Sequence, residues 1–557
     1  MSESSNSSDA TLYGLDLESR QMVLDTVALL RKRLLTREKI LEWDQKEVFP
    51  EEVLREMLGP EIGLQMLMIP EEYGGMGGGA RDSCVVTREM SKICLGVGTA
   101  FFALQLGADP LMVGGTEEQK QKWLGKIAAG EALVAYAVTE PGAGSDVANL
   151  KTKAEPVTND AGEVTGYSVN GTKQFISTGA AADFITLLAK TPEGPTFFVV
   201  EKGTPGFEPG RSEEKHGIRA SQTSVLSFRD VFVPVENLIG GEPGNGLKQA
   251  NQVFGYTRVM VASMALGAGE AALQIAIPYA KERFVSGSLL ADKQGYTHKL
   301  IIPNAVRLEA AAAYIEQLAE RLDAGEKDLQ VEGSIAKYFS SEAANRAAED
   351  AMQAMGGYGY INEFEVEKIK RDVKITCIYE GASEVQQNII STFRWRSSVK
   401  SKGAFYGGLA EEMNRLEQDF SQAGGRFIAL AAHALNEAVL LVHASKLTKQ
   451  QVVMFGLADM VTHVEVGAAL VRKAARAKRS SDPTAEKLQL ASAVFADEVA
   501  RAVSKNVMMI LMGSGVFDQK AVAEFIDRIH LHSLLESAQG IIGKMDRLAD
   551  IVFERSS

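Results

Sequence analysis

The spacing of apolar residues changes along the chain. In Leu17–Leu35 and Glu117–Ala129 apolar residues recur at helical spacing, which predicts an N-terminal helical domain over 15–134. Over 135–242 short β-rich runs are separated instead by Gly, Pro and Asp, which is typical of strands joined by turns. Asn170-Gly171 stands between two of these runs and predicts a hairpin turn. We therefore expect a small antiparallel β domain in this region.

Helical periodicity returns in the second half of the chain. Ala305–Leu322 is rich in Ala, Leu and Glu at helical spacing, which predicts a helical bundle over 243–398. A Gly-containing break at Lys402–Gly408 precedes a further helical block over 405–557. The expected fold class is α+β and mainly α: an N-terminal helical domain, a small antiparallel β domain, a C-terminal four-helix bundle and an extra helical domain.

Composition is that of a soluble globular protein. The 557 residues are 45% hydrophobic and 24% charged, which suits several packed domains. No run of about twenty uninterrupted apolar residues predicts a membrane span. The net charge of −13 argues against nucleic acid as a partner. Residues 401–557 carry 18 Lys/Arg and 18 Asp/Glu, so the acidic excess lies in the rest of the chain and the last block is expected to form a separate unit.

The cysteines and the N-terminal segment bear on location. Cys84, Cys94 and Cys377 are few and scattered, which indicates a reduced compartment without a disulfide framework. Met1–Arg20 is polar and Ser-rich and has neither the apolar core of a signal peptide nor the basic face of a transit peptide. We therefore expect a cytoplasmic protein of a bacterium. The seven histidines show no metal-ligand spacing, so no metal site is predicted.

Two separated blocks carry the candidate chemistry. Tyr136–Asp146 reads YAVTEPGAGSD, and its glycines allow the backbone to approach a ligand closely and point N–H groups at it. Gln353–Gln387 contains a glycine pair, a charged helical run and one acid, Glu380, in a Tyr-Glu-Gly turn. A third Gly-rich stretch, Leu266–Ala272, lies inside a helical pattern with no strand before it, so it predicts close helix packing rather than dinucleotide binding.

These two blocks, in this order, resemble the two signatures of the acyl-CoA dehydrogenases. The resemblance implies that Glu380 is the base that removes the α-proton of a saturated acyl-CoA, while flavin N5 takes the β-hydride. The product would be a trans-2-enoyl-CoA in fatty-acid β-oxidation, and an electron-transferring flavoprotein would reoxidise the FAD. Some family members carry the catalytic acid at the position immediately before the arginine that corresponds to Arg258. In this chain that position is Thr257, so of the two positions that carry the acid in the family only the Tyr-Glu-Gly turn has one, Glu380.

The resemblance also implies the binding residues. The FAD contacts are expected to be Tyr136, Val138, Thr139, Gly144, Ser145, Phe175, Ile176, Ser177, Arg283, Lys293, Gln294, Gln353, Gly356, Gly357, Ala382 and Glu384. The substrate contacts are expected to be Ser145, Tyr256, Thr257, Arg258 and Gly381. The chain departs from the family pattern where Phe175 replaces a commoner tryptophan, where Ala382 replaces threonine, and in Arg283–Gly287.

The helical block after 405 resembles the extension of the very-long-chain type. That architecture implies a homodimer, and a basic cluster at Arg472–Arg479 is either a solvated helix face or a peripheral contact with the inner membrane. Phe101–Leu104 matches the floor of the family's acyl pocket and is apolar, which suits an aliphatic chain, although core packing explains it equally well. Two rival functions stay open: an acyl-CoA oxidase of the same fold, and an assembly or scaffold protein that retains the fold.

Overall fold

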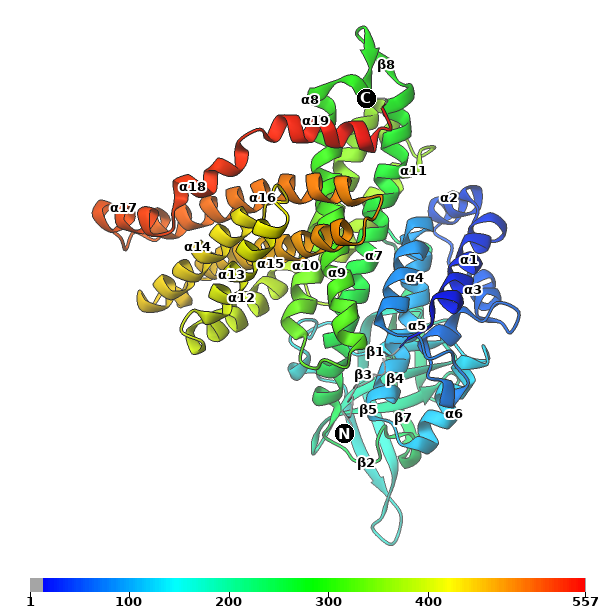
Figure 1. Ribbon diagram of the computed structural model, residues 1–557. Helices are drawn as coiled ribbons and strands as arrows, with labels where there is room; N and C mark the ends of the chain where they lie inside the picture. Colours follow the sequence, from blue (N-terminus) through cyan, green and yellow to red (C-terminus); the bar gives the residue numbers. More distant parts are fainter. Residues whose placement is uncertain (1–13, 556–557) are drawn as a thin grey trace, which may run out of the picture. The chain divides into compact units, whose positions relative to one another are not determined.

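The computed structural model describes residues 14–555, except for the side chain of Tyr256. The N-terminal segment considered above for targeting therefore lies largely outside the described residues. Two compact units are present (Figure 1): one contains the chain up to Met260 together with Leu318–Leu329, and the other contains the remainder. The long helices α7 (Gly246–Glu282) and α9 (Ile302–Asp323) contribute to both units. The four finer domain boundaries stay predictions.

Helices precede the sheet in the first unit. They begin at capping residues: the Asp16 side chain accepts a hydrogen bond from Ser19 N at the start of α1, and Thr116 and Gln119 form a capping box at the start of α6, which satisfies otherwise unpaired N–H groups. The helices are α1 (Leu17–Arg33), α2 (Arg37–Lys46), α3 (Glu51–Leu58), α4 (Ala80–Ile93), α5 (Leu95–Gly114) and α6 (Glu117–Ala128).

A twisted sheet follows these helices. Its strands among the described residues are β1 (Val134–Ala137), β2 (Lys153–Thr158), β3 (Val164–Ser177), β4 (Phe184–Thr191), β5 (Gly194–Glu201), β6 (Phe207–Ser212) and β7 (Thr223–Pro234). The order is β1-β4-β2-β3-β7-β6, with β5 on β4. Most neighbours are antiparallel as expected, but β1 and β2 both run parallel to β4, with Val134 opposite Phe184 and Lys153 opposite Lys190, so the sheet is mixed.

The predicted hairpin at Asn170-Gly171 is wrong, because both residues lie inside β3. The register shifts at this point between β3 and β7, and the Asn170 side chain exchanges hydrogen bonds of 3.0 and 2.9 Å with Asp230 across that irregularity. A Cβ on Gly171 would lie 2.7 Å from the Thr152 Cα. The pair therefore marks a β-bulge and a close strand contact. The β2–β3 turn lies earlier, where Asn159 and Glu163 pair.

The second unit is helical apart from the short hairpin of β8 (Phe284–Val285) and β9 (Ser288–Leu289). Gly269 in α7 packs closely, since a Cβ there would lie 3.0 Å from the Ala344 Cα, as expected for a small residue between helices. The other helices are α8 (Gln294–Tyr296), α10 (Gln330–Met355), α11 (Glu365–Val373), α12 (Ser383–Lys400), α13 (Ala404–Asp419), α14 (Gly425–Ala444), α15 (Gln451–Arg479), α16 (Ala485–Met508), α17 (Gln519–Arg528), α18 (Leu531–Leu535) and α19 (Ile541–Val552). The predicted fold class is thus confirmed.

Four described helices, α5, α7, α14 and α15, are long and apolar enough to cross a membrane by length and composition alone. In α5, α7 and α15 between 72% and 83% of the apolar window is buried inside the protein, and in α14 half of it is. Packing therefore accounts for most of the apolar surface of three of these helices.

A buried ionic network joins the C-terminal extension (residues 405–557) to the helices before it. The Arg394 guanidinium on α12 donates to Glu465 of α15 at 2.7 and 2.9 Å and to Glu332 of α10 at 3.0 Å. The hydroxyls of Tyr406 and Tyr314 also donate to Glu465, at 3.1 and 3.4 Å. Burial alone would lower the pKa of Arg394, but the attraction of Glu465 outweighs it and raises that pKa above its usual value.

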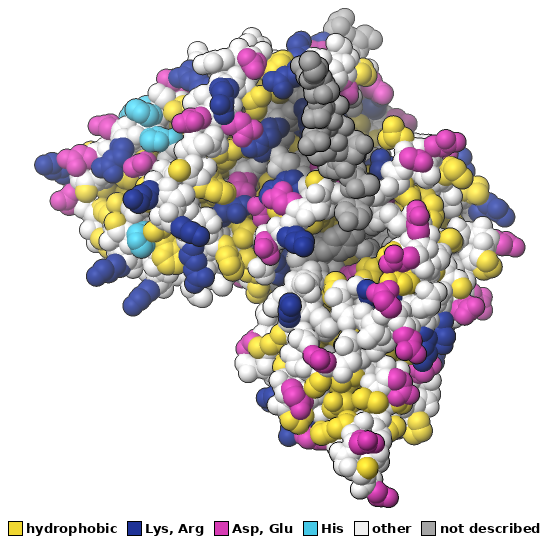
Figure 2. Space-filling view, turned by 60° about the horizontal axis from the view of Figure 1, so that its bottom comes forward, with side chains coloured by type: hydrophobic (Ala, Val, Ile, Leu, Met, Phe, Trp, Pro, Cys, Tyr) yellow, Lys and Arg dark blue, Asp and Glu magenta, His cyan; other side chains and the backbone are white. Residues whose placement is uncertain are grey.

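The basic cluster on α15 is not simply a solvated face. Arg472 donates to both carboxylate oxygens of Glu412 at 2.6 and 2.7 Å, and Lys473 lies 3.0 Å from both Glu309 and Glu316. Basic and acidic side chains are interspersed on the face shown in Figure 2. Two of the basic residues thus form ion pairs with acids on other helices, and membrane contact through the cluster stays a prediction.

Replacing Arg394 by methionine should lower the free energy of unfolding by about 3–5 kcal/mol, because Glu465 and Glu332 would be left buried without their counter-charge. Urea unfolding followed by circular dichroism measures the loss. The control is Arg479→Met, whose partner Asp419 is exposed and whose loss should stay below about 1 kcal/mol. An equal loss of unfolding free energy in Arg394→Met and Arg479→Met would show that the buried network around Arg394 does not stabilise the second unit.

Candidate functional site

Glu380 lies in a strained turn of the second unit. The turn, Tyr379–Ala382, joins the short helix η8 (Lys374–Cys377) to α12, and Glu380 is half-buried. Both Glu380 and Gly381 have left-handed backbones, with φ of 53° and 94°. A non-glycine residue rarely adopts this conformation unless its surroundings enforce it, and such residues cluster at functional sites.

Two buried side chains hold the carbonyls of this turn. Lys337 of α10 donates from Nζ to the Gly381 oxygen at 2.7 Å. Gln386 of α12 donates from Nε2 to the Glu380 and Gly381 oxygens at 3.1 and 3.0 Å. A side chain at position 381 would collide with the Gln386 amide, so this position requires glycine. Both carbonyls are fixed from inside the protein, which positions the Glu380 carboxylate.

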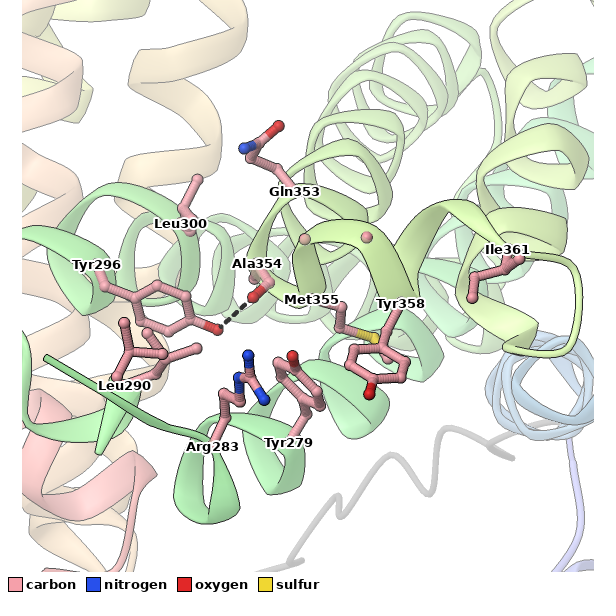
Figure 3. Close-up of a pocket in the computed structure, with 13 residues that line it drawn as sticks. Tyr279, Arg283, Leu290, Tyr296, Leu300, Gln353, Ala354, Met355, Tyr358 and Ile361 are labelled. Atoms are coloured by element: carbon pink, nitrogen blue, oxygen red, sulfur yellow. Dashed lines mark hydrogen bonds between the residues drawn. The ribbon is translucent and has the colours of Figure 1, made fainter. Parts of the chain in front are cut away.

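A cavity of about 720 Å³ gathers several of the predicted cofactor residues. Its walls include Arg283, Gln353, Gly356 and Gly357, and Figure 3 shows Arg283 beside Tyr279, on the side of the cavity where Tyr296 lies. The Tyr296 hydroxyl donates to the Ala354 oxygen at 3.2 Å. The Gln353 side chain points away from Arg283. Residues 70 positions apart in the sequence thus line the same cavity, and their contact with FAD stays a prediction.

The residues at this cavity fit an anionic, extended cofactor. A Cβ on Gly356 or Gly357 would meet no atom within 4 Å, so the missing side chains leave open space beside the backbone. Gly356 also has a left-handed backbone, with φ of 59°. Arg283 offers the planar set of donors that suits phosphate oxygens. The cavity could therefore hold part of a nucleotide cofactor.

Lys293 and Gln294 lie close to this cavity but have protein partners. The Lys293 Nζ is 3.4 Å from the Ser286 oxygen, in the turn of the β8–β9 hairpin. Gln294 donates to Asp546 of α19 at 2.8 Å, and His298 lies 3.1 Å from the same carboxylate. The altered Arg283–Gly287 segment forms the hairpin itself, and Phe284 at its start is 63% exposed. Gln294 therefore contacts the extension in this structure.

In the first unit the predicted flavin contacts lie on two neighbouring segments. Tyr136 and Val138 are in or just after β1, and the Thr139 oxygen accepts a hydrogen bond of 2.9 Å from Gln174 N. Gly144 and Ser145 are exposed. The loop Thr139–Asp146 and the end of β3 are thus brought together, with backbone and hydroxyl groups available to a ligand.

Phe175 is the most unusual residue of this cluster. It is 60% exposed although aromatic, and its φ is 60°. The register between β3 and β7 shifts between Lys173 and Ile176, so a bulge turns Phe175 away from the ladder while Ile176 stays buried and Ser177 half-buried. Bulges often redirect side chains beside active sites. An exposed ring held in a strained conformation suits stacking on a planar ligand.

Sequence reasoning missed the ion pair that joins these two segments. Lys173 is fully buried and donates to the Val138 oxygen at 2.9 Å and to Glu140 at 2.7 Å. Burial lowers the pKa of Lys173 to about 8 against the opposing effect of Glu140. Burial also opposes ionisation of Glu140, but hydrogen bonds from Lys173, Thr152 and Lys151 hold its pKa below the usual value. The available signal was the spacing of Lys173, which is four residues after the buried Val169 and therefore faces the same side of β3.

The remaining predicted residues are distributed between the units. Thr257 and Arg258 are buried in the part of α7 that belongs to the first unit, and the Tyr256 side chain lies outside the described residues. Ala382 is the N-cap residue of α12 without a side-chain hydrogen bond, and Glu384 is exposed on its first turn. The predicted contacts therefore form two clusters, one in each unit. Among the described residues no three His, Cys, Asp or Glu side chains are grouped as metal ligands.

Comparison with known proteins gives one consistent family. Models of the acyl-CoA dehydrogenase N-terminal, middle and C-terminal domains match residues 18–131, 135–231 and 244–393. An acyl-CoA dehydrogenase of Bacillus subtilis (strain 168) is 38% identical over 380 residues, which are 67% of this chain and 96% of that protein. A solved structure of acyl-CoA dehydrogenase complexed with FAD from Bacillus anthracis is 26% identical with a TM-score of 0.82 and covers 97% of this chain and 95% of that one. A chain in a structure described as the electron transferring flavoprotein of Acidaminococcus fermentans is 34% identical with a TM-score of 0.63, over 68% of this chain and 98% of that one.

Replacing Lys173 by methionine should cost about 3–5 kcal/mol of unfolding free energy, because Glu140 would stay buried without its partner. It should also release bound flavin, since the loop at Val138 and the end of β3 would separate. Absorbance of the purified protein and urea unfolding measure the two effects. Lys153→Met, on the exposed side of β2, should change neither, and the double variant Lys173→Met/Glu140→Gln should recover part of the stability. No recovery would contradict the unpaired-charge explanation.

Replacing Gly357 by valine should lower the flavin content severalfold without changing the melting temperature of the protein freed of flavin. The backbone of Gly357 has no left-handed requirement and a Cβ meets nothing there, so only the ligand space is filled. Gly408→Val, at an equally open position on α13, is the matched control. Full flavin content in Gly357→Val would show that the cofactor does not occupy this cavity.

Proposed function

The chain belongs to the acyl-CoA dehydrogenase family, and on that premise we propose that it uses FAD to oxidise saturated acyl-CoA thioesters to trans-2-enoyl-CoA in fatty-acid β-oxidation. The observation that carries the proposal is Glu380, an acid held in a strained turn by Lys337 and Gln386. A base for such a weakly acidic C–H must be fixed in place, because its effectiveness depends on position.

The residues of this chain would divide the work between proton removal and cofactor binding. Glu380 would accept the α-proton, and its backbone N–H would stabilise negative charge on the thioester oxygen. In the second unit, Arg283 and the backbone of Gly356 and Gly357 would contact the nucleotide part of an FAD. In the first unit, Phe175 would lie against a flavin ring. When bound, FAD supplies the acceptor for the β-hydrogen, which leaves as hydride. Loss of the proton and the hydride gives the trans-2 double bond.

The acyl chain is proposed to be aliphatic. Phe101, Phe102 and Leu104 of α5 are all buried and uncharged, so this segment offers no cation to a distal carboxylate. An apolar wall favours a hydrocarbon tail through the hydrophobic effect. Titration with acyl-CoAs of graded chain length determines the length of the tail.

A second copy of the chain and a flavoprotein are the proposed partners. Large apolar side chains are exposed on or beside the segments that form the cavity: Tyr360 is 83% exposed, Ile361 47% and Phe284 63%. A homodimer would cover such side chains. Electron-transferring flavoprotein is the proposed acceptor, in line with the similar chain from Acidaminococcus fermentans.

The test is an anaerobic titration of the purified flavoprotein with saturated acyl-CoAs of graded chain length. The substrate should bleach the flavin absorbance, and the chain length that bleaches it fastest identifies the substrate. Glu380→Gln should keep FAD and bind acyl-CoA but bleach at least about a hundredfold more slowly, because general base catalysis contributes about 10²–10⁴ in rate.

The matched control is Glu411→Gln, since Glu411 is an exposed acid on α13 and is not among the predicted binding residues. It should bleach at the rate of the unaltered protein. Normal bleaching by Glu380→Gln would exclude Glu380 as the base. Rapid oxygen consumption by the reduced protein in the absence of electron-transferring flavoprotein would instead identify an oxidase, and failure of every acyl-CoA to bleach the flavin would favour a scaffold role.

A further inference from the structure

The side chains that hold the Glu380 turn stand next to a second buried network. Lys337 and Gln386, which donate to the turn, are followed in the chain by Tyr338 and Gln387. The Tyr338 hydroxyl and the Gln387 amide both donate to Oδ1 of Asp459, each at 2.8 Å. Gln387 also donates to the Tyr338 hydroxyl at 3.0 Å. One carboxylate oxygen thus joins the two helices that carry the supports of the turn.

Asp459 comes from a distant part of the chain. It lies on α15 in the C-terminal extension, beyond the residues that match the family models. Its helix is anchored to α12, because Glu465, six residues after Asp459 on α15, accepts a hydrogen bond of 2.7 Å from Arg394. A carboxylate on an anchored helix can fix the positions of the groups that it accepts from.

The Tyr338 hydroxyl is suited to this contact. Burial, together with Asp459, raises the pKa of Tyr338 far above its usual value, so the hydroxyl stays protonated and donates. Charge-assisted hydrogen bonds to a carboxylate are stronger than neutral ones. The contact therefore holds α10 at Tyr338 and α12 at Gln387 in a fixed relation to each other.

We propose that Asp459 of the C-terminal extension is a positioning residue for the Glu380 turn, acting through Tyr338 and Gln387 on the neighbouring supports Lys337 and Gln386. The proposal rests on the proposed function of Glu380. Without Asp459, Tyr338 of α10 and Gln387 of α12 lose the carboxylate oxygen to which both donate. Lys337 and Gln386 would then hold the two turn carbonyls less firmly, and Glu380 would spend less time in the position that proton removal needs.

The experiment compares the full-length flavoprotein with Asp459→Ala, Asp459→Asn and the control Glu309→Gln. In Asp459→Asn the side-chain amide oxygen can still accept hydrogen bonds from Tyr338 and Gln387, whereas the alanine side chain cannot. Glu309 also links the extension to an earlier helix, since it pairs with Lys473 and Lys487, but these pairs do not involve the helices that carry Lys337 and Gln386. Tyr338→Phe, which removes one of the two donors, serves as the second variant if Asp459→Ala does not fold.

The first readout is hydrogen–deuterium exchange of the peptide that contains residues 378–386, measured without substrate. Exchange of these backbone amides should become at least about tenfold faster in Asp459→Ala and stay unchanged in Glu309→Gln. This readout does not depend on the reaction. Unchanged exchange in Asp459→Ala, or the same increase in Glu309→Gln, would overturn the proposal.

The second readout is anaerobic bleaching at saturating acyl-CoA of the length chosen by the titration. Asp459→Ala should reduce the bleaching rate about tenfold or more while the acyl-CoA concentration for half-maximal rate changes less than about threefold. Asp459→Asn should recover most of the rate. Equal loss of rate and affinity, or no recovery by asparagine, would indicate a merely structural role and overturn the proposal. If the unaltered protein does not bleach, the proposed function fails, and the exchange readout still decides whether Asp459 holds the turn.

Discussion

The contact between Arg394 and Glu465 is the interaction on which the second unit depends. It brings an arginine of α12 and an acid of α15 together inside the protein, with Glu332, Tyr406 and Tyr314 completing the hydrogen bonds. Burying two charges costs free energy that only such full pairing offsets. The same helices, α12 and α15, also carry Gln387 and Asp459. The ion pair that links the extension to α12 therefore lies on the same two helices as the contact between Gln387 and Asp459.

The two clusters of candidate site residues share a physical device. In each, a non-glycine residue has a left-handed backbone, Phe175 in one and Glu380 in the other. In each, a buried lysine donates to a nearby backbone carbonyl: Lys173 to Val138 and Lys337 to Gly381. Strained conformations persist only where the surroundings enforce them. A buried lysine is effective in this role because it cannot exchange its protein acceptor for water.

Local patterns of residues predicted the fold class correctly, but they failed where a contact between distant segments decides the local structure. Helical spacing predicted the helices of the second half of the chain, and the resemblance of two sequence blocks to the acyl-CoA dehydrogenases made Glu380 the candidate base. Asn170-Gly171 was predicted to be a turn, but the contacts of β3 with Thr152 and Asp230 make it a bulge. Arg472 and Lys473 resemble a solvated face by their spacing, yet their acidic partners lie on other helices. Gln294 contacts Asp546 of α19, 252 positions later.

The sequence by itself determined the order of helical and β segments, the apolar character of the core and the presence of one acid in a Tyr-Glu-Gly turn, because these follow from neighbouring residues and their spacing. The tertiary structure alone decided which buried charges are paired, which backbone positions are strained and which side chains hold the Glu380 turn. The reason is that burial changes the cost of a charge or an unpaired polar group, and the partner that offsets this cost comes from a segment far away in the chain. Lys337, Gln386 and Asp459 carry no local signal of their roles, and only folding brings them together.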